Sequence, residues 1–236
     1  MSEVLIYLFG CSHCKCFIHD RANGGVLHHD NVTLYNKFKK SASARGLTNP
    51  KSTLGYKEDI NHTLEHVNLS KSTHNICVMK FGQVDIEYNY YYKIYGKNES
   101  INKNDFYIDT INEYVAFVKN LKQSFPNIRF IVNGVNMPNI YDLQKYMKNT
   151  SRPVSMPKIE YKDHFDDHYL FNTILQDKCE TENIEYFDLT SETTENRCIK
   201  PEFIGSDNHL AGGDKPNFKV HDVFLNKLFK VINKDG

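Results

Sequence analysis

Two short segments near opposite ends of the chain contain residue types that can carry out acyl transfer. Segment 10–13 (GCSH) follows an apolar run and places Ser12 at a predicted strand-to-helix turn, where helical N–H groups can hold an anion. Asp207 and His209 lie two residues apart in a polar, glycine-flanked loop. A carboxylate that orients a histidine base can activate a serine hydroxyl. Ser12, His209 and Asp207 are therefore our candidate nucleophile, base and orienting acid, against the plainer alternatives of a helix cap and a solvated loop.

The elements that must position these residues alternate between strands and helices. Five short apolar runs read as buried strands: Val4 to Phe9, Val32 to Phe38, Ile76 to Phe81, Ile128 to Val132 and Ile184 to Leu189. Four longer stretches have helical spacing: Leu54 to Val67 after a Ser52-Thr53 cap signal, Phe106 to Phe125, Tyr161 to Cys179 and Val220 to Ile232.

This alternation predicts an α/β fold. We expect a three-layer α/β/α sandwich around a five-stranded, mostly parallel, flavodoxin-like sheet, formed by residues 1–236 as a single domain. In such folds, sites lie at the carboxyl ends of the strands.

Composition and charge remove several function classes. The 236 residues carry 29 Lys and Arg against 29 Asp and Glu, so we expect no nucleic-acid partner. No apolar run has the length of a membrane-spanning helix, so we expect no membrane partner either. Glu3 precedes the first apolar run, where a signal peptide carries basic residues. We therefore expect a cytoplasmic protein whose six cysteines are reduced thiols.

A tight group of Cys and His residues near Ser12 raises the alternative of a zinc site. Its members are Cys11, His13, Cys14, Cys16 and His19. The spacing is tighter than that of structural zinc sites, and no second ligand pair follows at a finger-like distance. The same segment also lacks the phosphate-binding composition that a flavodoxin-like cofactor protein needs. We expect neither a metal nor a cofactor.

Four segments, taken in chain order, resemble the motif blocks of the SGNH (GDSL-like) hydrolase superfamily. They are Ser12 after the first strand, 41–47 (SASARGL) after the second, 82–85 (GQVD) after the third, and the Asp-x-His before the last helix. The resemblance covers essentially the whole chain. It implies that Ser12 is the nucleophile, that Gly46 donates a backbone N–H to the oxyanion, and that Asp207 and His209 complete the triad.

The chain departs from the family pattern at two places. The third block of the family is Gly-x-Asn-Asp, whose Asn is an oxyanion donor, and Val84 stands at that position. Either Gln83 or Asn89 replaces that donor, or the oxyanion hole relies on the backbone N–H groups of Ser12 and Gly46. The Asp-x-His spacing is also shorter than the commoner Asp-x-x-His, and resembles that of some related O-acyltransferases.

The resemblance implies a serine-dependent hydrolase of ester groups, in the first place O-acetyl groups, on a small-molecule or glycan substrate. Two alternatives stay open: a sugar O-acyltransferase with the same triad, and a non-catalytic glycan-binding domain that has lost its oxyanion Asn. Tyrosines that can stack on sugars follow the third strand. The candidate substrate-binding residues are Asp85, Tyr88, Asn89 and Asn133. The sequence leaves the oligomeric state open.

Overall fold

A computed structural model describes residues 3–17, 26–29, 31–69, 74–205, 208–210 and 219–233. Its centre is a six-stranded sheet with strand order β2-β3-β1-β4-β5-β6. The strands are β1 (Val4–Gly10), β2 (Val26–His29), β3 (Val32–Asn36), β4 (His74–Lys80), β5 (Ile128–Asn133) and β6 (Glu185–Phe187). All neighbours pair in parallel except β2 and β3. The strands from β3 to β6 therefore bring their carboxyl ends to one edge.

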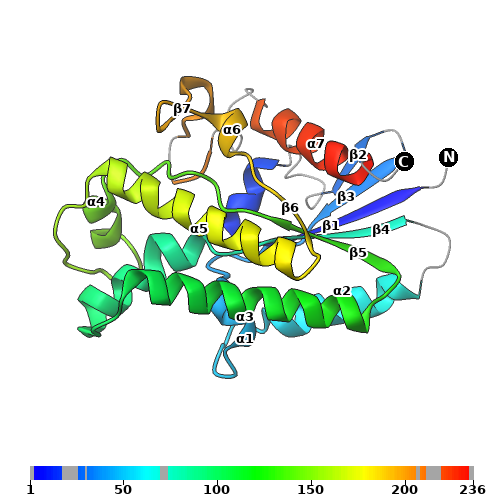
Figure 1. Cartoon of the computed structure of the whole chain (residues 1–236), viewed down its shortest axis with the longest axis horizontal. Helices are drawn as coiled ribbons and strands as arrows, with labels where there is room; N and C mark the ends of the chain where they lie inside the picture. Colours follow the sequence, from blue (N-terminus) through cyan, green and yellow to red (C-terminus); the bar gives the residue numbers. More distant parts are fainter. Residues whose placement is uncertain are drawn as a thin grey trace.

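Helices cover both faces of the sheet, with α7 on one side and α2 and α3 on the other (Figure 1). The helices are α1 (Ala44–Thr48), α2 (Tyr56–Asn68), α3 (Lys103–Ser124), α4 (Leu143–Lys148), α5 (Tyr161–Thr181), α6 (Thr190–Thr193) and α7 (Lys219–Ile232). Shorter elements are η1 (Ser12–Phe17), η2 (Asp85–Asn89), η3 (Tyr92–Gly96), η4 (Pro201–Phe203) and the hairpin β7 (Thr194–Glu195) and β8 (Cys198–Ile199). Within the described ranges, every helix is too short or too polar to cross a bilayer.

Each face of the sheet has its own hydrophobic core. One core packs side chains of α2, α3 and α5 against the sheet, and the other packs those of η1 and α7. Val220, Phe224 and Leu228 of α7 recur every four residues and are buried, as expected for one face of a helix. Phe224 stacks on Phe17 of η1, with ring centroids 4.2 Å apart. Because both faces are covered, the strands read as continuous apolar runs rather than alternating ones.

The predicted α/β sandwich is confirmed, and each of the five predicted strands overlaps an observed one. The strand count was too low by one, because β2 has only two apolar residues followed by two histidines and shows no strand pattern. The predicted cap at Ser52-Thr53 was also wrong. Helix α2 begins after Gly55, which takes the left-handed conformation and offers no side-chain cap.

The end of β1, which sets the position of Ser12, is fixed by close backbone packing. A Cβ on Gly10 would lie 2.4 Å from the carbonyl oxygen of Lys80 on the neighbouring strand. The Gly10 N–H donates to the hydroxyl of Tyr56 (3.0 Å), which in turn donates to the carbonyl of Lys37 (2.6 Å). The chain therefore enters η1, and Ser12, from a strand end with little freedom to move.

The substitution Gly10→Ala should force β1 and β4 apart at their carboxyl ends. Overpacking of this kind costs about 1–3 kcal/mol. We expect urea unfolding of the variant to show a lower midpoint with an unchanged slope. An unchanged midpoint would mean that the strand ends separate without cost, contrary to the packing described.

Candidate active site

The structure brings Ser12 and His209 together, although 197 residues separate them in sequence. Ser12 is the first residue of η1, and its Oγ lies 2.9 Å from Nε2 of His209. Both side chains are half-buried. At this distance Nε2 can accept the hydroxyl proton, which is the geometry a serine nucleophile needs. The third predicted member, Asp207, lies outside the described residues.

The backbone around His209 is held by the loop between β5 and α4. The amide nitrogen of Asn139 donates to the carbonyl oxygens of Gly205 (3.2 Å) and His209 (3.0 Å). A Cβ on Gly205 would lie 2.0 Å from the carbonyl oxygen of His209. Any side chain at position 205 would therefore force the backbone at Gly205 or at His209 to shift.

A second buried histidine supports the same segment. His13 Nε2 lies 3.1 Å from the carbonyl oxygen of Asn208, so this nitrogen carries a proton and donates it. Its Nδ1 faces the Cys11 thiol at 3.4 Å, and its ring centroid lies 4.5 Å from that of His209. Burial lowers the pKa of His13 to about 4. His13 is thus a neutral packing and hydrogen-bonding partner near pH 7, not a second base.

Glu87 is a carboxylate in the interior, close to the segments of Ser12 and His209, with only 2% of its surface exposed. Its Oε1 accepts from Gln83 Nε2 (2.6 Å) and lies 3.6 Å from His168 Nε2. Its Oε2 accepts from Asn208 Nδ2 (3.5 Å) and lies 3.6 Å from His13 Nε2. Burial alone would raise the pKa of Glu87, but the surrounding imidazoles and the Gln83 hydrogen bond outweigh it and hold the pKa low. The ionised carboxylate therefore joins segments that are far apart in sequence.

The N-terminus of α1 does not supply the predicted oxyanion donor. The Gly46 N–H donates to the Ser43 side chain (3.0 Å), which caps the helix. The Ala44 N–H donates to Asp85 Oδ2 (2.7 Å), and Asn89 donates to Asp85 Oδ1 (3.0 Å). Burial raises the pKa of Asp85 to about 6. In the structure the Gly46 N–H is bound within the cap and Asp85 binds the start of α1, so the predicted roles of Gly46 toward an oxyanion and of Asp85 toward a substrate stay predictions.

The side-chain amides of two further predicted site residues form hydrogen bonds within the protein. Gln83 donates to Glu87 and to the carbonyl of Asn136 (3.2 Å), and its oxygen accepts from the Asn136 N–H (2.8 Å). It joins η2 to the loop after β5, and both N–H groups of its side-chain amide are used in these bonds. Asn133 is fully buried and donates to the carbonyl of Phe187 on β6 (3.1 Å). Its predicted role in substrate binding stays a prediction.

The other two predicted substrate-binding residues, Tyr88 and Asn89, line a cavity of about 890 Å³. Residues 41–54, η2, η3 and Arg152 surround it. Ser12 and His209 are not among its lining residues. The cavity is large enough for a ligand of several rings.

The Cys and His residues near Ser12 do not form a metal centre in the part of the chain that the structure describes. Cys11 and Cys14 are buried free thiols, and burial raises the pKa of Cys11 to about 11. The Cys11 thiol is therefore protonated and packs as a small apolar group.

Sequence reasoning did not find the residues that support the catalytic pair. These are His13, Glu87, Asn139 and Asn208. The four-residue spacing of Gln83 and Glu87 is the only local signal, because it allows contact within one helical turn. The remaining contacts cross between distant segments.

The substitution Glu87→Gln nearly preserves the shape of the side chain but removes its charge. It should weaken the contacts that hold the segment around His209. We expect the rate at which a fluorophosphonate labels Ser12 to fall at least tenfold, and the unfolding free energy to drop by about 1–3 kcal/mol. Glu160→Gln, at an exposed carboxylate, is the matched control. A wild-type labelling rate in the Glu87 variant would contradict the proposed support.

The buried His164 of α5 should make stability depend on pH. Burial, followed by the nearby His168, lowers the pKa of His164 to about 3. Between that value and the unfolded pKa of about 6.5, only the unfolded chain binds the proton, so stability is lost as pH falls through this window. We expect His164→Asn to reduce the loss of unfolding free energy between pH 6 and 4 by about 1 kcal/mol per pH unit.

Urea titrations at several pH values measure this slope, with His62→Asn, at an exposed histidine, as the control. Equal slopes in wild type and His164→Asn would show that the fold accepts a charged His164 without cost.

Comparison with known proteins places the fold. The sequence matches no family model and no curated protein at a significant level. Solved structures do match it, each at low sequence identity. A GDSL-like lipase from Bacteroides thetaiotaomicron shares 13% identity over 98% of this chain and 89% of its own, with a TM-score of 0.53. A carbohydrate acetylesterase from Sinorhizobium meliloti shares 10% sequence identity over 97% of this chain and 100% of its own, with a TM-score of 0.54. An acetylxylan esterase from Geobacillus stearothermophilus shares 11% sequence identity over 98% of this chain and 95% of its own, with a TM-score of 0.55. Together with the observed sheet order, these matches show that the chain has the fold of the SGNH (GDSL-like) hydrolase superfamily.

Proposed function

We propose that this protein is a serine-dependent esterase that removes acyl groups, in the first place acetyl groups, from a carbohydrate. The observation that carries the proposal is the 2.9 Å contact between Ser12 Oγ and His209 Nε2 at the carboxyl end of β1. A hydroxyl and an imidazole at this distance form the working pair of an acyl-transfer enzyme.

In the proposed reaction, Ser12 Oγ attacks the ester carbonyl carbon while its proton passes to His209 Nε2. The tetrahedral adduct collapses to an acyl-serine, and His209 returns the proton to the departing sugar hydroxyl. Water then attacks the acyl carbon, again losing a proton to His209, and the acid leaves as Ser12 is restored. The acceptance of a proton at Nε2 requires the tautomer with hydrogen on Nδ1, and Asp207 is the proposed acceptor of that hydrogen.

The oxyanion of the adduct needs at least one donor. The N–H of Ser12 stands at the first position of η1, where a helical N–H has no partner within its helix. We propose it as the primary donor, because the Gly46 and Gln83 groups bind elsewhere. Each lost donor costs about 3 kcal/mol of transition-state stabilisation, so slower turnover than that of an enzyme with a full oxyanion hole is expected.

A carbohydrate substrate is supported by two kinds of observation. Two of the solved structures with this fold are titled as a carbohydrate acetylesterase and an acetylxylan esterase. In this chain, two stacked tyrosines, Tyr88 and Tyr92, line the cavity beside α1, with ring centroids 5.5 Å apart. Aromatic rings of this kind pack on sugar faces, and their hydroxyls can bond to the sugar. Transfer of the acyl group to a second sugar is the alternative outcome of the same acyl-serine step.

A fluorophosphonate serine probe and p-nitrophenyl acetate test the proposal. We expect the probe to modify Ser12, as located by peptide mass spectrometry, and Ser12→Ala and His209→Ala to lower acetate release about 10³-fold or more. Ser155→Ala and His62→Gln, both at exposed positions, should leave the rate unchanged. The absence of an adduct, with equal trace turnover in all variants, would refute the esterase and favour a glycan-binding domain.

A further inference from the structure

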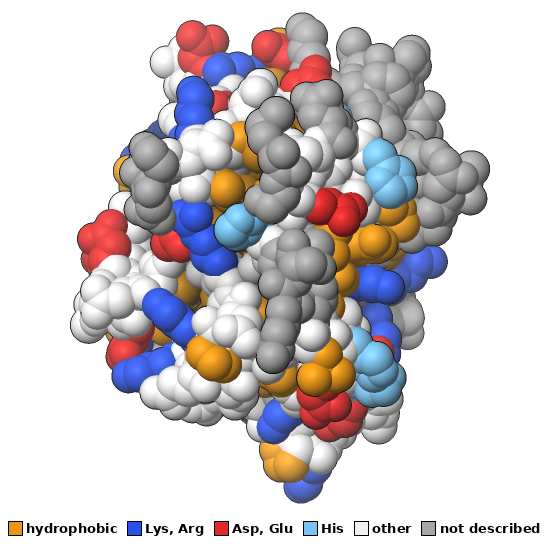
Figure 2. Space-filling model, turned by 90° about the vertical axis from the view of Figure 1, so that its right-hand side faces the viewer, with side chains coloured by type: hydrophobic (Ala, Val, Ile, Leu, Met, Phe, Trp, Pro, Cys, Tyr) orange, Lys and Arg blue, Asp and Glu red, His pale blue; other side chains and the backbone are white. Residues whose placement is uncertain are grey.

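The lining of the cavity beside α1 has a net positive charge, whereas the chain as a whole is neutral. The chain carries equal numbers of basic and acidic residues. The cavity lining contains five cations and one carboxylate: Arg45, Lys51, Lys93, Lys97, Arg152 and Glu113. On the face shown in Figure 2, acidic and basic side chains are interspersed. The excess of positive charge is therefore a local property of this cavity.

Several of these charges are already engaged, and the rest are free to meet a ligand. Arg45 donates to Thr110 and lies over the Phe106 ring, and Lys93 pairs with Glu99 at 2.8 Å. Arg152 and Lys51 are exposed and have no ion-pair partner among the residues that the structure describes. An anionic group entering the cavity would thus meet cations that are not yet neutralised.

The remaining lining suits a ligand rich in hydroxyl groups. Tyr88 and Tyr92 stack with an interplanar angle of 13°, and Lys97 lies 5.6 Å from the centroid of the Tyr92 ring. Hydroxyl and amide side chains form most of the opposite wall: Ser41, Ser43, Thr48, Asn49, Ser52 and Thr53. This mixture of aromatic faces and small polar groups is a surface on which sugar rings can pack and bond.

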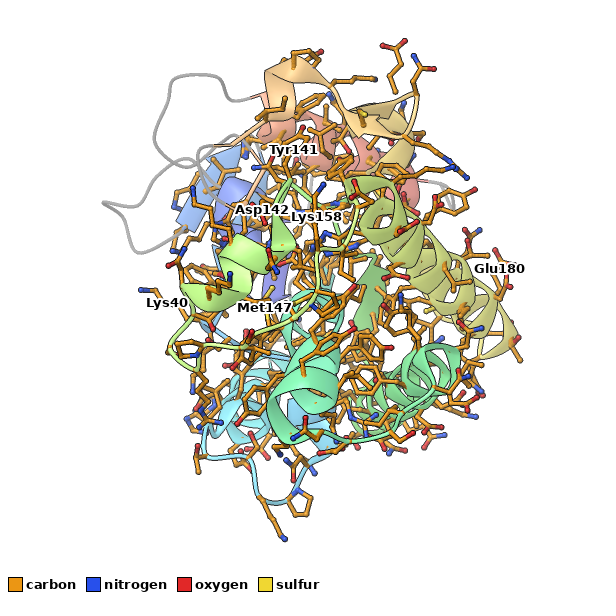
Figure 3. The ribbon with its side chains drawn as sticks, turned by 90° about the vertical axis from the view of Figure 1, so that its left-hand side faces the viewer. Lys40, Tyr141, Asp142, Met147, Lys158 and Glu180 are labelled. Atoms are coloured by element: carbon orange, nitrogen blue, oxygen red, sulfur yellow. The ribbon has the colours of Figure 1, made fainter. Side chains whose placement is uncertain are left out.

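The cavity lies at the same edge of the sheet as the nucleophile. Its lining includes Tyr56, whose hydroxyl accepts from the N–H of Gly10, two residues before Ser12. Figure 3 views the end of the molecule at which α4 and Lys40 lie, and Lys40 directly precedes the first lining residue, Ser41. The cavity and Ser12 are therefore neighbours at the carboxyl ends of the strands, linked through Tyr56.

The lining does not favour a nucleotide or coenzyme phosphate. Such groups are commonly held by free backbone N–H groups at a helix start. Here the N–H groups of Ala44 and Gly46 at the start of α1 already bind Asp85 and Ser43. What remains are side-chain cations, and an Arg guanidinium such as that of Arg152 binds carboxylates through two parallel hydrogen bonds.

We propose that the cavity binds an anionic carbohydrate, so that the esterase acts on an acylated acidic glycan. The anionic group is a carboxylate of a uronic acid unit or a sulfate on a sugar, and both share the chemistry that the lysines and arginines recognise. The position of the ester in this inference rests on the proposed function. The negative charge of the glycan rests on the lining of the cavity alone.

Calorimetric titration of the Ser12→Ala protein tests the charge preference without turnover. The probes are an oligogalacturonate, a sulfated oligosaccharide, a neutral xylo-oligosaccharide of the same length and coenzyme A. We expect at least one of the acidic sugars to bind tenfold or more tightly than the neutral one. This preference should shrink as NaCl rises from 50 to 300 mM, because salt screens the cations.

A double variant, Lys51→Gln with Arg152→Gln, should reduce acidic-sugar binding at least fivefold and leave the neutral sugar unaffected. Lys230→Gln, at an exposed cation of α7, is the charge-matched control and should change nothing. Equal binding of acidic and neutral sugars, tightest binding of coenzyme A, or an acidic preference that survives in the double variant would each overturn the inference. Failure of the esterase proposal appears separately, as a wild-type protein whose Ser12 takes no fluorophosphonate.

Discussion

The buried carboxylate of Glu87 is the constraint on which the arrangement of the site depends. An ionised carboxylate removed from water costs several kcal/mol unless hydrogen bonds and opposite dipoles replace its hydration. Here they come from Gln83 before η2, His13 of η1, His168 of α5 and Asn208 beside the catalytic base. The carboxylate is satisfied only when all four segments meet at the end of the sheet. The position of the base over the nucleophile follows from that meeting.

Sequence reasoning found what is encoded in local patterns. The strands before and after the helices, and the Ser12 and His209 pair, follow from apolar runs and short motifs that keep their order along the chain. It failed where a residue type has several uses and only the fold selects one. The amides of Gln83 and Asn133 and the N–H of Gly46 are all suitable oxyanion or substrate ligands by type, but each is used in an internal hydrogen bond. Strand β2 was missed for a related reason, because its pairing with β3 supplies the regularity that its own sequence lacks.

The third motif block shows how a family pattern can keep its architecture and change its chemistry. Asp85 holds the start of α1 through the Ala44 N–H, which joins the second and third of the segments that resemble the family. Val84, at the place of the family's Asn, is partly buried against the hydrophobic core. The Glu87 network lies three residues further along and supports the loop of the catalytic base. This segment therefore joins the start of α1, the hydrophobic core and the segment of His209.

The order of the elements along the chain has a consequence for biosynthesis. Every strand of the central sheet, and Ser12 with it, precedes residue 188, whereas His209 and α7 follow. Domains begin to fold from the N-terminal side as a ribosome delivers them. Val220, Phe224 and Leu228 of α7 cover one face of the sheet, so that face stays uncovered until the end of the chain has been delivered. Stacking of Phe224 on Phe17 then brings α7 onto η1, the element that carries Ser12. We therefore expect the closing of this second hydrophobic core and the arrival of His209 beside Ser12 to be late, linked events in the folding of a newly made chain.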